Sequence, residues 1–302
     1  MQILASEKID QVKWDDCIEH SPNVLVYANY EYLNTLCDHW AALIIGDYET
    51  VLPLPWRNKW GIRYLYAPAF IQQLGFFGNL NNLNHSEIWR SIFEFAKFGD
   101  LFFNYQNEDL LLDRGIIAKT NYTISLRQTY PEIAADYTQD LVKNLQKSAK
   151  KNLHYSSELL IENCVSLFQK QYQERFPHLT NESFLRFKQI CLKFSKDGRC
   201  ITRTVYAENE LVSTAILFNH CHRLYLIMNA TNETGRTLAA NHFLIDQIIQ
   251  EFSEEELLFD FEGSEKKGIK AFYESFHPAN QPYFQQSYNK LPKWVNWIRN
   301  RR

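Results

Sequence analysis

One stretch near the C-terminus decides the fold: Leu257-Leu258-Phe259-Asp260-Phe261-Glu262-Gly263-Ser264, followed from Gly268 by Ile269-Lys270-Ala271-Phe272-Tyr273-Glu274-Ser275-Phe276. The apolar run 257–261 favours a buried strand, because apolar side chains can cover both faces of a sheet. Gly263 allows a sharp exit from the strand, and Ser264 can cap the helix that follows. Apolar residues then recur at spacings of three and four, which is typical of an amphipathic helix.

Two acids stand out in this stretch. Asp260 and Glu262 lie two residues apart, so a strand would point both side chains to one face near its C-terminal end. Ligands of open α/β sheets collect outside such strand ends. We therefore expect the two acids to orient an amine or to act as a general base. The alternative for Glu262 is a role in capping or in the turn.

A family resemblance rests on the same residues. A DFEGS turn, then a glycine, then a helix ending in F-Y-x-S-F resembles the closing segment of FemAB-like proteins. These are acyltransferases of the GNAT superfamily that carry two GNAT-type domains in tandem. The resemblance implies an α/β (α+β) chain of two tandem GNAT-like domains, each a mixed, mostly antiparallel sheet flanked by helices.

Composition sets wide bounds on class and location. The chain has 302 residues with 45% hydrophobic and 15% aromatic content, enough for one large domain or two ordinary ones. A net charge of −3 argues against broad binding to DNA or membranes by charge alone. No apolar run approaches the ~20 residues of a membrane span, and no signal peptide is recognisable. Six dispersed cysteines without a CxxC pair favour reduced thiols, so we expect a cytoplasmic protein.

The order of predicted elements repeats along the chain. The second half runs strand, two helices, three antiparallel strands, helix, strand, helix, strand, and the first half follows nearly the same order. This repeat predicts two units, 1–128 and 129–302, with a strand at 283–288 and a helix from Pro292 in the second. Periodicity alone indicates alternating α and β elements, and the GNAT architecture comes from the resemblance.

The resemblance also implies where an acyl donor binds. GNAT domains hold a thioester between the fourth and fifth strands, and a loop after the fourth, Gln/Arg-x-x-Gly-x-Gly/Ala, binds its pyrophosphate at a helix N-terminus. The matching stretch here is 232–237, in which Gly235 is kept but Asn232 and Thr237 replace the expected residues. Arg236 can contact phosphate, or this can be an ordinary loop. FemAB-like proteins often lack the loop because their donor can be an aminoacyl-tRNA.

Three lysines suggest a second contact for a phosphate-bearing ligand. Lys143, Lys147 and Lys151 are spaced by four on a predicted helix at 137–151, so they share one helical face. FemAB-like enzymes carry a basic stretch at this position as well. The alternative is a solvated helix surface.

Tyrosines are the candidate proton donors. Tyr225 and Tyr273 can protonate a leaving thiolate or hydroxyl, and the alternative is that each is a core aromatic with a satisfied hydroxyl. Related peptidoglycan-bridge enzymes have Phe followed by Lys in the closing helix, where this chain has Phe272 followed by Tyr273. Tyrosine brings no positive charge, so an identical bridge-building reaction is not implied. Asn229 completes the expected lining of the site.

Other enzyme classes lack their signatures. No GxSxG elbow, P-loop, HExxH or Rossmann fingerprint occurs, and His220-Cys221-His222 is interpreted as a strand end rather than a metal site. The resemblance implies an N-acyltransferase (EC 2.3 class) with acyl-CoA or aminoacyl-tRNA as donor and a small-molecule or cell-wall-type amine as acceptor, and we expect no metal. The alternative is a non-catalytic descendant that binds a ligand or partner.

Overall fold

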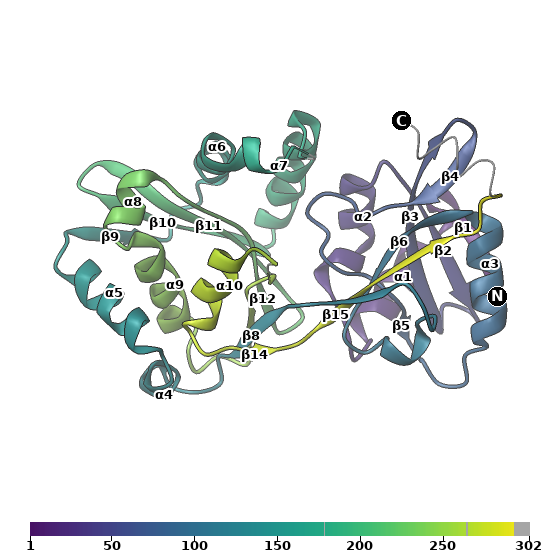
Figure 1. Ribbon diagram of the computed structural model, residues 1–302, viewed down its shortest axis with the longest axis horizontal. Helices are drawn as coiled ribbons and strands as arrows, with labels where there is room; N and C mark the ends of the chain where they lie inside the picture. Colours follow the sequence, from purple (N-terminus) through teal and green to yellow (C-terminus); the bar gives the residue numbers. More distant parts are fainter. Residues whose placement is uncertain (178, 264, 293–302) are drawn as a thin grey trace. The chain divides into compact units, whose positions relative to one another are not determined.

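The computed structural model describes residues 1–177, 179–263 and 265–292, and it divides the chain into two compact units. Unit 1 comprises Met1–Lys119 and the segment that begins at Pro282, and unit 2 is Thr120–Gln281. Each unit has its own mixed sheet flanked by helices (Figure 1). This architecture confirms the predicted fold class.

Unit 1 is built on an eight-stranded sheet in the order β1-β2-β3-β4-β6-β15-β7, with β5 paired to β3. The pairs are antiparallel except for β4 and β6, which run parallel. The strands are β1 (Gln2–Ala5), β2 (His39–Ile45), β3 (Thr50–Lys59), β4 (Ile62–Leu65), β5 (Phe77–Gly78), β6 (Phe98–Phe103), β7 (Ile116–Lys119) and β15 (Tyr283–Asn289).

Helices pack on both faces of the unit 1 sheet, as the alternation of side chains along β2 requires. Trp40 of β2 meets Trp14 of α1 with ring centroids 5.1 Å apart. Leu43, of opposite parity, belongs to a separate cluster with Ile88 and Ile92 of α3. The helices are α1 (Gln11–Glu19), α2 (Tyr30–Leu36) and α3 (His85–Phe95), with short 3-10 turns at η1 (Ser6–Lys8), η2 (Val26–Ala28) and η3 (Glu108–Leu110).

Unit 2 repeats the arrangement in a seven-stranded sheet of order β14-β8-β13-β12-β11-β10-β9. Its one parallel pair among the described strands is β12 with β13, the counterpart of β4 with β6. The strands are β8 (Tyr122–Ser125), β9 (Leu153–Ser156), β10 (Cys200–Ala207), β11 (Glu210–His220), β12 (Arg223–Thr231), β13 (Leu258–Asp260) and β14 (Ala279–Asn280).

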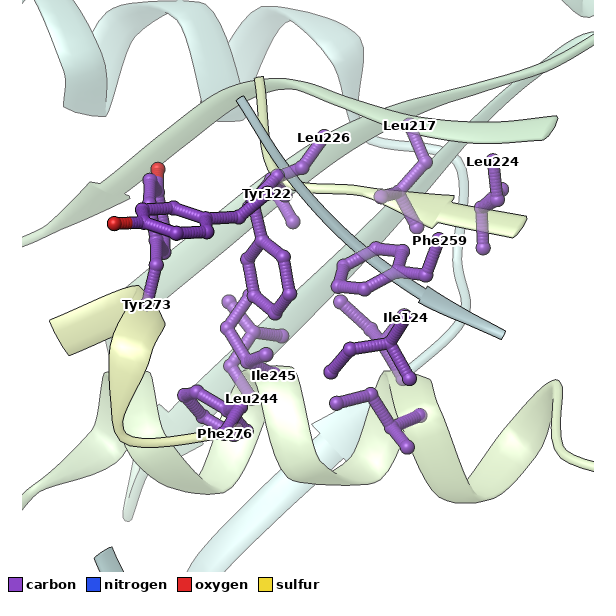
Figure 2. Close-up of a cluster of buried hydrophobic side chains, with 14 of the residues drawn as sticks. Tyr122, Ile124, Leu217, Leu224, Leu226, Leu244, Ile245, Phe259, Tyr273 and Phe276 are labelled. Carbon is purple, nitrogen blue, oxygen red and sulfur yellow. The ribbon is translucent and has the colours of Figure 1, made fainter. Parts of the chain in front are cut away.

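The unit 2 helices lie on both sides of that sheet. Figure 1 shows α6 and α7 on one side and α5 and α9 on the other. A large apolar cluster between the sheet, α9 and α10 includes Leu226, Phe259, Leu244 and Phe276 (Figure 2). The helices are α4 (Tyr130–Ala135), α5 (Gln139–Ala149), α6 (Ile161–Tyr172), α7 (Asn181–Ser195), α8 (Glu233–Thr237), α9 (Ala240–Glu251) and α10 (Lys267–Glu274), with η4 (Gln173–Arg175).

The two units exchange a strand, and this corrects the expected division at residue 128. β8 follows unit 1 in the chain but pairs with β13 in the unit 2 sheet. β15, which we expected in the second unit, pairs with β6 and β7 in the unit 1 sheet. Element order cannot reveal such an exchange, because each strand satisfies equivalent hydrogen bonds in either sheet.

Several local predictions are also corrected or fall outside the described residues. His220 ends β11 as expected, but Cys221 and His222 form the following turn with φ of 45° and 61°, so the two histidines do not share a strand face. Burial lowers the pKa of His220 to about 4. Ser264 and the helix expected after Pro292 lie outside the described residues.

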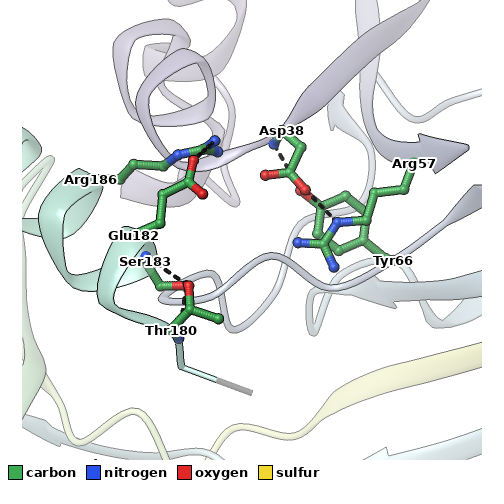
Figure 3. A network of polar contacts seen from close by, with 7 residues as sticks. All are labelled: Asp38, Arg57, Tyr66, Thr180, Glu182, Ser183 and Arg186. Carbon is green, nitrogen blue, oxygen red and sulfur yellow. Dashed lines mark hydrogen bonds and ion pairs between the residues drawn. The ribbon is translucent and has the colours of Figure 1, made fainter. Parts of the chain in front are cut away.

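Each unit contains an ordered polar network, shown in Figure 3. In unit 1, the Arg57 guanidinium binds the Asp38 carboxylate and lies 4.1 Å from the centre of the Tyr66 ring. In unit 2, Thr180 and Ser183 form a capping box that satisfies backbone N–H groups at the start of α7. None of the described helices is both long and apolar enough to cross a bilayer.

Candidate functional site

The parallel strands of unit 2 separate at the predicted site. β12 and β13 are paired from Arg223↔Leu258 to Tyr225↔Asp260, and β13 then ends while β12 continues to Thr231. Beyond Tyr225, one edge of β12 still pairs with β11, and its other edge no longer pairs with β13. The sheet therefore opens between the two strands next to Asp260, and α10 follows on the β13 side.

Asp260 is held in a buried ion pair. Its Oδ2 accepts a hydrogen bond from Arg223 Nη1 at 2.7 Å, and its Oδ1 accepts one from the backbone N–H of Glu262 at 2.9 Å. The Arg223 guanidinium also donates to Gln281 at 2.9 Å. Asp260 is 0% exposed and Arg223 6% exposed. With both carboxylate oxygens engaged, Asp260 positions the end of the strand and the turn after it, and it does not reach a ligand.

Glu262 lies in the turn rather than in the strand. Its backbone adopts φ of 64° and that of Gly263 φ of 53°, so the expected alternation with Asp260 is wrong. A Cβ at position 263 would stand 2.0 Å from the backbone oxygen of Thr120, and only glycine fits there. Burial raises the pKa of the Glu262 carboxyl well above its ordinary value.

Tyr273 brings α10 to the same place. Its ring is 9% exposed and stands 4.9 Å from the ring of Phe261, within the cluster of Figure 2. Burial raises the pKa of Tyr273, and the nearby charges of Glu262 and Asp260 raise it further. The phenol therefore stays protonated and can donate a hydrogen bond. The charge of Glu262 thus acts on the Tyr273 phenol, which comes from α10 after the turn.

Tyr172 belongs to this group, although the sequence analysis did not identify it. Its hydroxyl donates to the backbone oxygen of Thr231 at 3.4 Å, and its phenol contributes to the raised pKa of Tyr273. Its ring packs against Phe168 at 5.4 Å, and Lys266 Nζ lies 3.7 Å from the centre of the Phe176 ring. The end of α6 therefore forms an aromatic wall beside the turn that holds Glu262.

Tyr225 has a different position from Tyr273. It is 0% exposed, pairs in register with Asp260, and lies under the Arg223 guanidinium at 5.7 Å from its ring centre. A fully buried residue does not contact a ligand directly. This geometry favours the core-aromatic alternative for Tyr225.

The stretch expected to bind phosphate forms a short capped helix, α8. The side-chain oxygen of Asn232 accepts from Gly235 N at 2.7 Å, and its amide donates to Glu210 at 2.7 Å. A Cβ on Gly235 would stand 2.4 Å from the oxygen of Val212, so the glycine is needed for close packing. Arg236 is exposed and donates to the backbone oxygen of Thr231 at 2.7 Å.

The backbone N–H groups of this stretch are used within the chain. Those of residues 235, 236, 238 and 239 donate to Asn232, Asn232, Thr234 and Arg236 respectively. A pyrophosphate would need these donors to be available. These four donors are therefore not available to the phosphates of coenzyme A in this conformation.

The start of α9 presents a group that the sequence analysis missed. The His242 ring meets that of Phe272 from α10 at 4.9 Å, edge to face, and its Nδ1 is buried without a hydrogen-bond partner. Burial and then the charge of Lys147 lower the pKa of His242, which keeps the imidazole neutral. Beside it, Asn229 donates to the backbone oxygen of Thr214 at 3.0 Å and to Asn241 at 2.9 Å.

The three lysines do not form one surface. Lys143 lies 3.5 Å from Asp140 in an exposed pair. The charge of Lys147 lowers the pKa of His242. Lys151 lies beyond the end of α5 at Ala149, so it is not on the helical face of the other two lysines. Lys151 instead lines an open pocket of about 690 Å³ together with residues 207–210 of the β10–β11 turn and with α8.

Within residues 1–177, 179–263 and 265–292, no group of His, Cys, Asp or Glu is arranged to hold a metal ion. The six cysteines are free thiols. Glu262 offers a carboxyl with a raised pKa, Tyr273 a buried phenol, and His242 a neutral imidazole against Phe272.

Comparison with known proteins follows this geometry. A family model described as an acetyltransferase (GNAT) domain matches residues 141–271. The search of curated proteins found no match. Among solved structures, the chain is similar to FemX, with a TM-score of 0.67, 14% identity and 100% coverage of both chains.

Two further structures share the whole arrangement. A tandem GNAT protein from the clavulanic acid biosynthesis pathway has a TM-score of 0.56 and 10% identity, covering 97% of this chain and 99% of that one. The L-PGS of Bacillus licheniformis has a TM-score of 0.55 and 11% identity, covering 96% and 95% respectively. At these identities the likeness shows the fold alone, and it agrees with the tandem arrangement predicted from residues 257–276.

Proposed function

We propose that this chain, which has the FemAB-like fold of two GNAT-type units, is an N-acyltransferase that moves an acyl or aminoacyl group to an amine. The observation that carries the proposal is the opening between β12 and β13, bordered by Glu262 and Tyr273. A carboxyl with a raised pKa is a stronger base once ionised, and a protonated phenol is a donor. Once ionised, Glu262 is therefore the proton acceptor of this site, and Tyr273 is the hydrogen-bond donor.

The reaction follows from these two groups. The amine nitrogen attacks the carbonyl carbon of the donor ester, and its proton passes to the Glu262 carboxylate. The bond between the carbonyl carbon and the leaving oxygen or sulfur then breaks, and the leaving atom takes the phenol proton of Tyr273. The proton held by Glu262 then returns to the Tyr273 oxygen, which restores both groups. Positioning supplies most of the rate, and the proton transfer contributes about 10²–10⁴-fold.

The donor we favour is an aminoacyl ester, as in a charged tRNA, rather than acyl-CoA. The backbone donors at 235–239 are already bonded within the chain, which argues against a coenzyme A phosphate site in the present conformation. Arg236 and Lys147 remain candidates to contact a phosphate-bearing donor, and the acceptor is a small-molecule or cell-wall-type amine. We place the protein in the cytoplasm, where free thiols persist.

A second function, binding without catalysis, is supported by the same bonded loop. The His242–Phe272 ring contact also joins the start of α9 to the last turn of α10. Under this alternative the unit binds a ligand or partner and transfers nothing.

The deciding experiment combines binding with transfer. Thermal melting with acetyl-CoA, a longer acyl-CoA and charged tRNA reports which donor stabilises the fold, because a ligand at 100 times its Kd adds about 2.7 kcal/mol. Transfer of a radiolabelled aminoacyl group to an amine pool is then measured for the wild type, for Glu262→Gln and for Glu255→Gln as an exposed control. Transfer that depends on Glu262 alone supports the enzyme. Stabilisation without transfer by any donor supports the binding protein.

A further inference from the structure

The turn between β3 and β4 in unit 1 carries the most exposed aromatic residue of the described chain. Trp60 is 61% exposed, whereas Trp14, Trp40 and Trp89 are buried. The strands close at Lys59↔Ile62, which leaves Trp60 and Gly61 as a two-residue turn. Trp60 adopts φ of 54° and Gly61 φ of 74°. Asn or Gly would fit the first position at lower cost, so a tryptophan there points to a role outside the fold.

Lysines surround this turn at one end of the unit 1 sheet. The register places Arg57, Tyr64, Phe98 and Asn289 in one row across β3, β4, β6 and β15. The residues one step beyond that row include Lys97 and Lys290, joined by a hydrogen bond from Lys290 N to Lys97 O at 2.7 Å. Both side chains and that of Lys59 are exposed.

Asp38 does not neutralise the positive charge of these lysines. Asp38 is already paired with Arg57. The Arg63 guanidinium lies between the rings of Trp56 and Phe95, 4.3 Å from each, and stiffens the base of the hairpin. Lys59 Nζ stands 4.9 Å from the centre of the Trp60 ring. An indole at the tip and three exposed lysines behind it form one amphipathic end.

We propose that this end of unit 1, made of Trp60, Lys59, Lys97 and Lys290, docks on an anionic phospholipid bilayer. Tryptophan prefers the boundary between headgroups and acyl chains, because its apolar ring and polar N–H are both satisfied there. Lysines behind it are attracted by anionic headgroups. A single-stranded nucleic acid would need several open rings for stacking, and the neighbouring rings of Tyr64 and Phe98 are stacked on each other at 5.2 Å. The charge and the single protruding indole therefore favour a bilayer.

Vesicle cosedimentation of the full-length protein tests the proposal. The wild type is expected to bind vesicles of phosphatidylcholine with phosphatidylglycerol and not vesicles of phosphatidylcholine alone. Binding should weaken at high salt, since the screening length falls to about 3 Å at 1 M. Trp60→Ala should reduce the vesicle affinity about tenfold. Each of Lys59→Ala, Lys97→Ala and Lys290→Ala should reduce it about fivefold.

A matched control and a spectroscopic measurement keep the test specific. Ile117→Ala, at a residue of the same unit that is 51% exposed, should leave vesicle binding unchanged. The difference between the emission spectra of the wild type and Trp60→Phe gives the fluorescence of Trp60. The maximum of this difference spectrum should shift to shorter wavelength when anionic vesicles are added. Absence of wild-type binding to anionic vesicles would overturn the proposal, and so would binding that Trp60→Ala does not weaken. If the hairpin variants instead lose affinity for single-stranded RNA while no variant binds vesicles, the surface is a nucleic-acid site and the proposal is wrong.

Discussion

The openings in the two sheets differ although the sheets share a topology. In unit 1 the last parallel pair is Leu65↔Gly99, and in unit 2 it is Tyr225↔Asp260. Beyond that pair in unit 1, Leu74 bridges to Phe103 and its N–H donates to the oxygen of Phe102 at 2.7 Å. The segment before β5 thus fills the place that stays open in unit 2.

The chemistry of the two openings differs accordingly. The cavity left in unit 1, lined by Pro55, Leu74 and Leu101 among others, has about 10 Å³, room for a single water. Gly99 stands at the register position that Asp260 holds in unit 2. A duplicated sheet can therefore keep its topology while one copy becomes packed core and the other keeps its acids. This contrast locates the proposed activity in unit 2.

The largest expected effect tests that location. Glu262→Gln should lower kcat/KM for transfer by about 10²–10⁴-fold, because it removes the proposed proton acceptor and keeps the shape. A control in the packed opening of unit 1 is Gln73→Met, at a buried residue next to Leu74, which should leave kcat unchanged. Steady-state transfer kinetics on both variants measure the contrast. If Gln73→Met lost as much rate as Glu262→Gln, the activity would not be confined to unit 2.

The pH dependence of the same residue has a definite sign. A folded-state pKa raised above the unfolded value makes the ionised carboxyl unfavourable in the fold. Its contribution to stability is therefore complete below the ordinary Glu pKa and is lost as the pH rises through the raised value. Denaturant unfolding at pH 5 and pH 8 should show a wild-type loss at the higher pH that Glu262→Gln lacks.

The second largest effect concerns the buried ion pair between Arg223 and Asp260 in unit 2. At the equivalent pair of unit 1, Leu65↔Gly99, neither residue carries a charge. Asp260→Ala leaves the Arg223 guanidinium buried without its carboxylate, so it should cost about 3–5 kcal/mol. The double variant Asp260→Leu/Arg223→Met should recover part of this, because neither charge is left alone. Urea unfolding of the two variants decides the matter. Equal losses would mean that packing rather than charge holds this end of β13.

The sequence predicted most elements of both units, including the strand that ends at Asp260 and the helix that carries Tyr273. It did so because the apolar spacings of 257–276 reflect local burial, which a single sequence records. It did not predict the exchange of β8 and β15, since hydrogen bonding between strands leaves no pattern of residue types. It also missed Tyr172 and His242, whose roles arise from contacts between helices distant in the chain.

The third effect on stability concerns Gly235 of α8, which packs closely against the backbone oxygen of Val212. Gly235→Ala places a Cβ 2.4 Å from the Val212 oxygen, so α8 must shift, and we expect a loss of about 1–3 kcal/mol. Gly268→Ala is the matched control, because no atom lies within 4 Å of its Cβ position in α10. That helical alanine should add about 0.5–1 kcal/mol. Thermal melts measure the melting temperature of both variants. If Gly235→Ala and Gly268→Ala change it equally, α8 can shift without cost, and the bonded N–H groups of residues 235, 236, 238 and 239 do not exclude coenzyme A.

The smallest effect concerns Lys147 and His242, which have no equivalent in the packed opening of unit 1. Burial is the first cause of the lowered pKa of His242 and the Lys147 charge the second, so Lys147→Gln should raise that pKa. Lys143→Gln, whose lysine is paired with Asp140 on the surface, should leave it unchanged. An NMR titration of the histidine ring protons follows both. A lowered folded-state pKa also means that stability is lost as the pH falls through it, and Lys147→Gln should reduce that acid loss. If the two lysine variants titrate alike, Lys147 does not act on the space between α9 and α10, and it can be dropped as a donor contact.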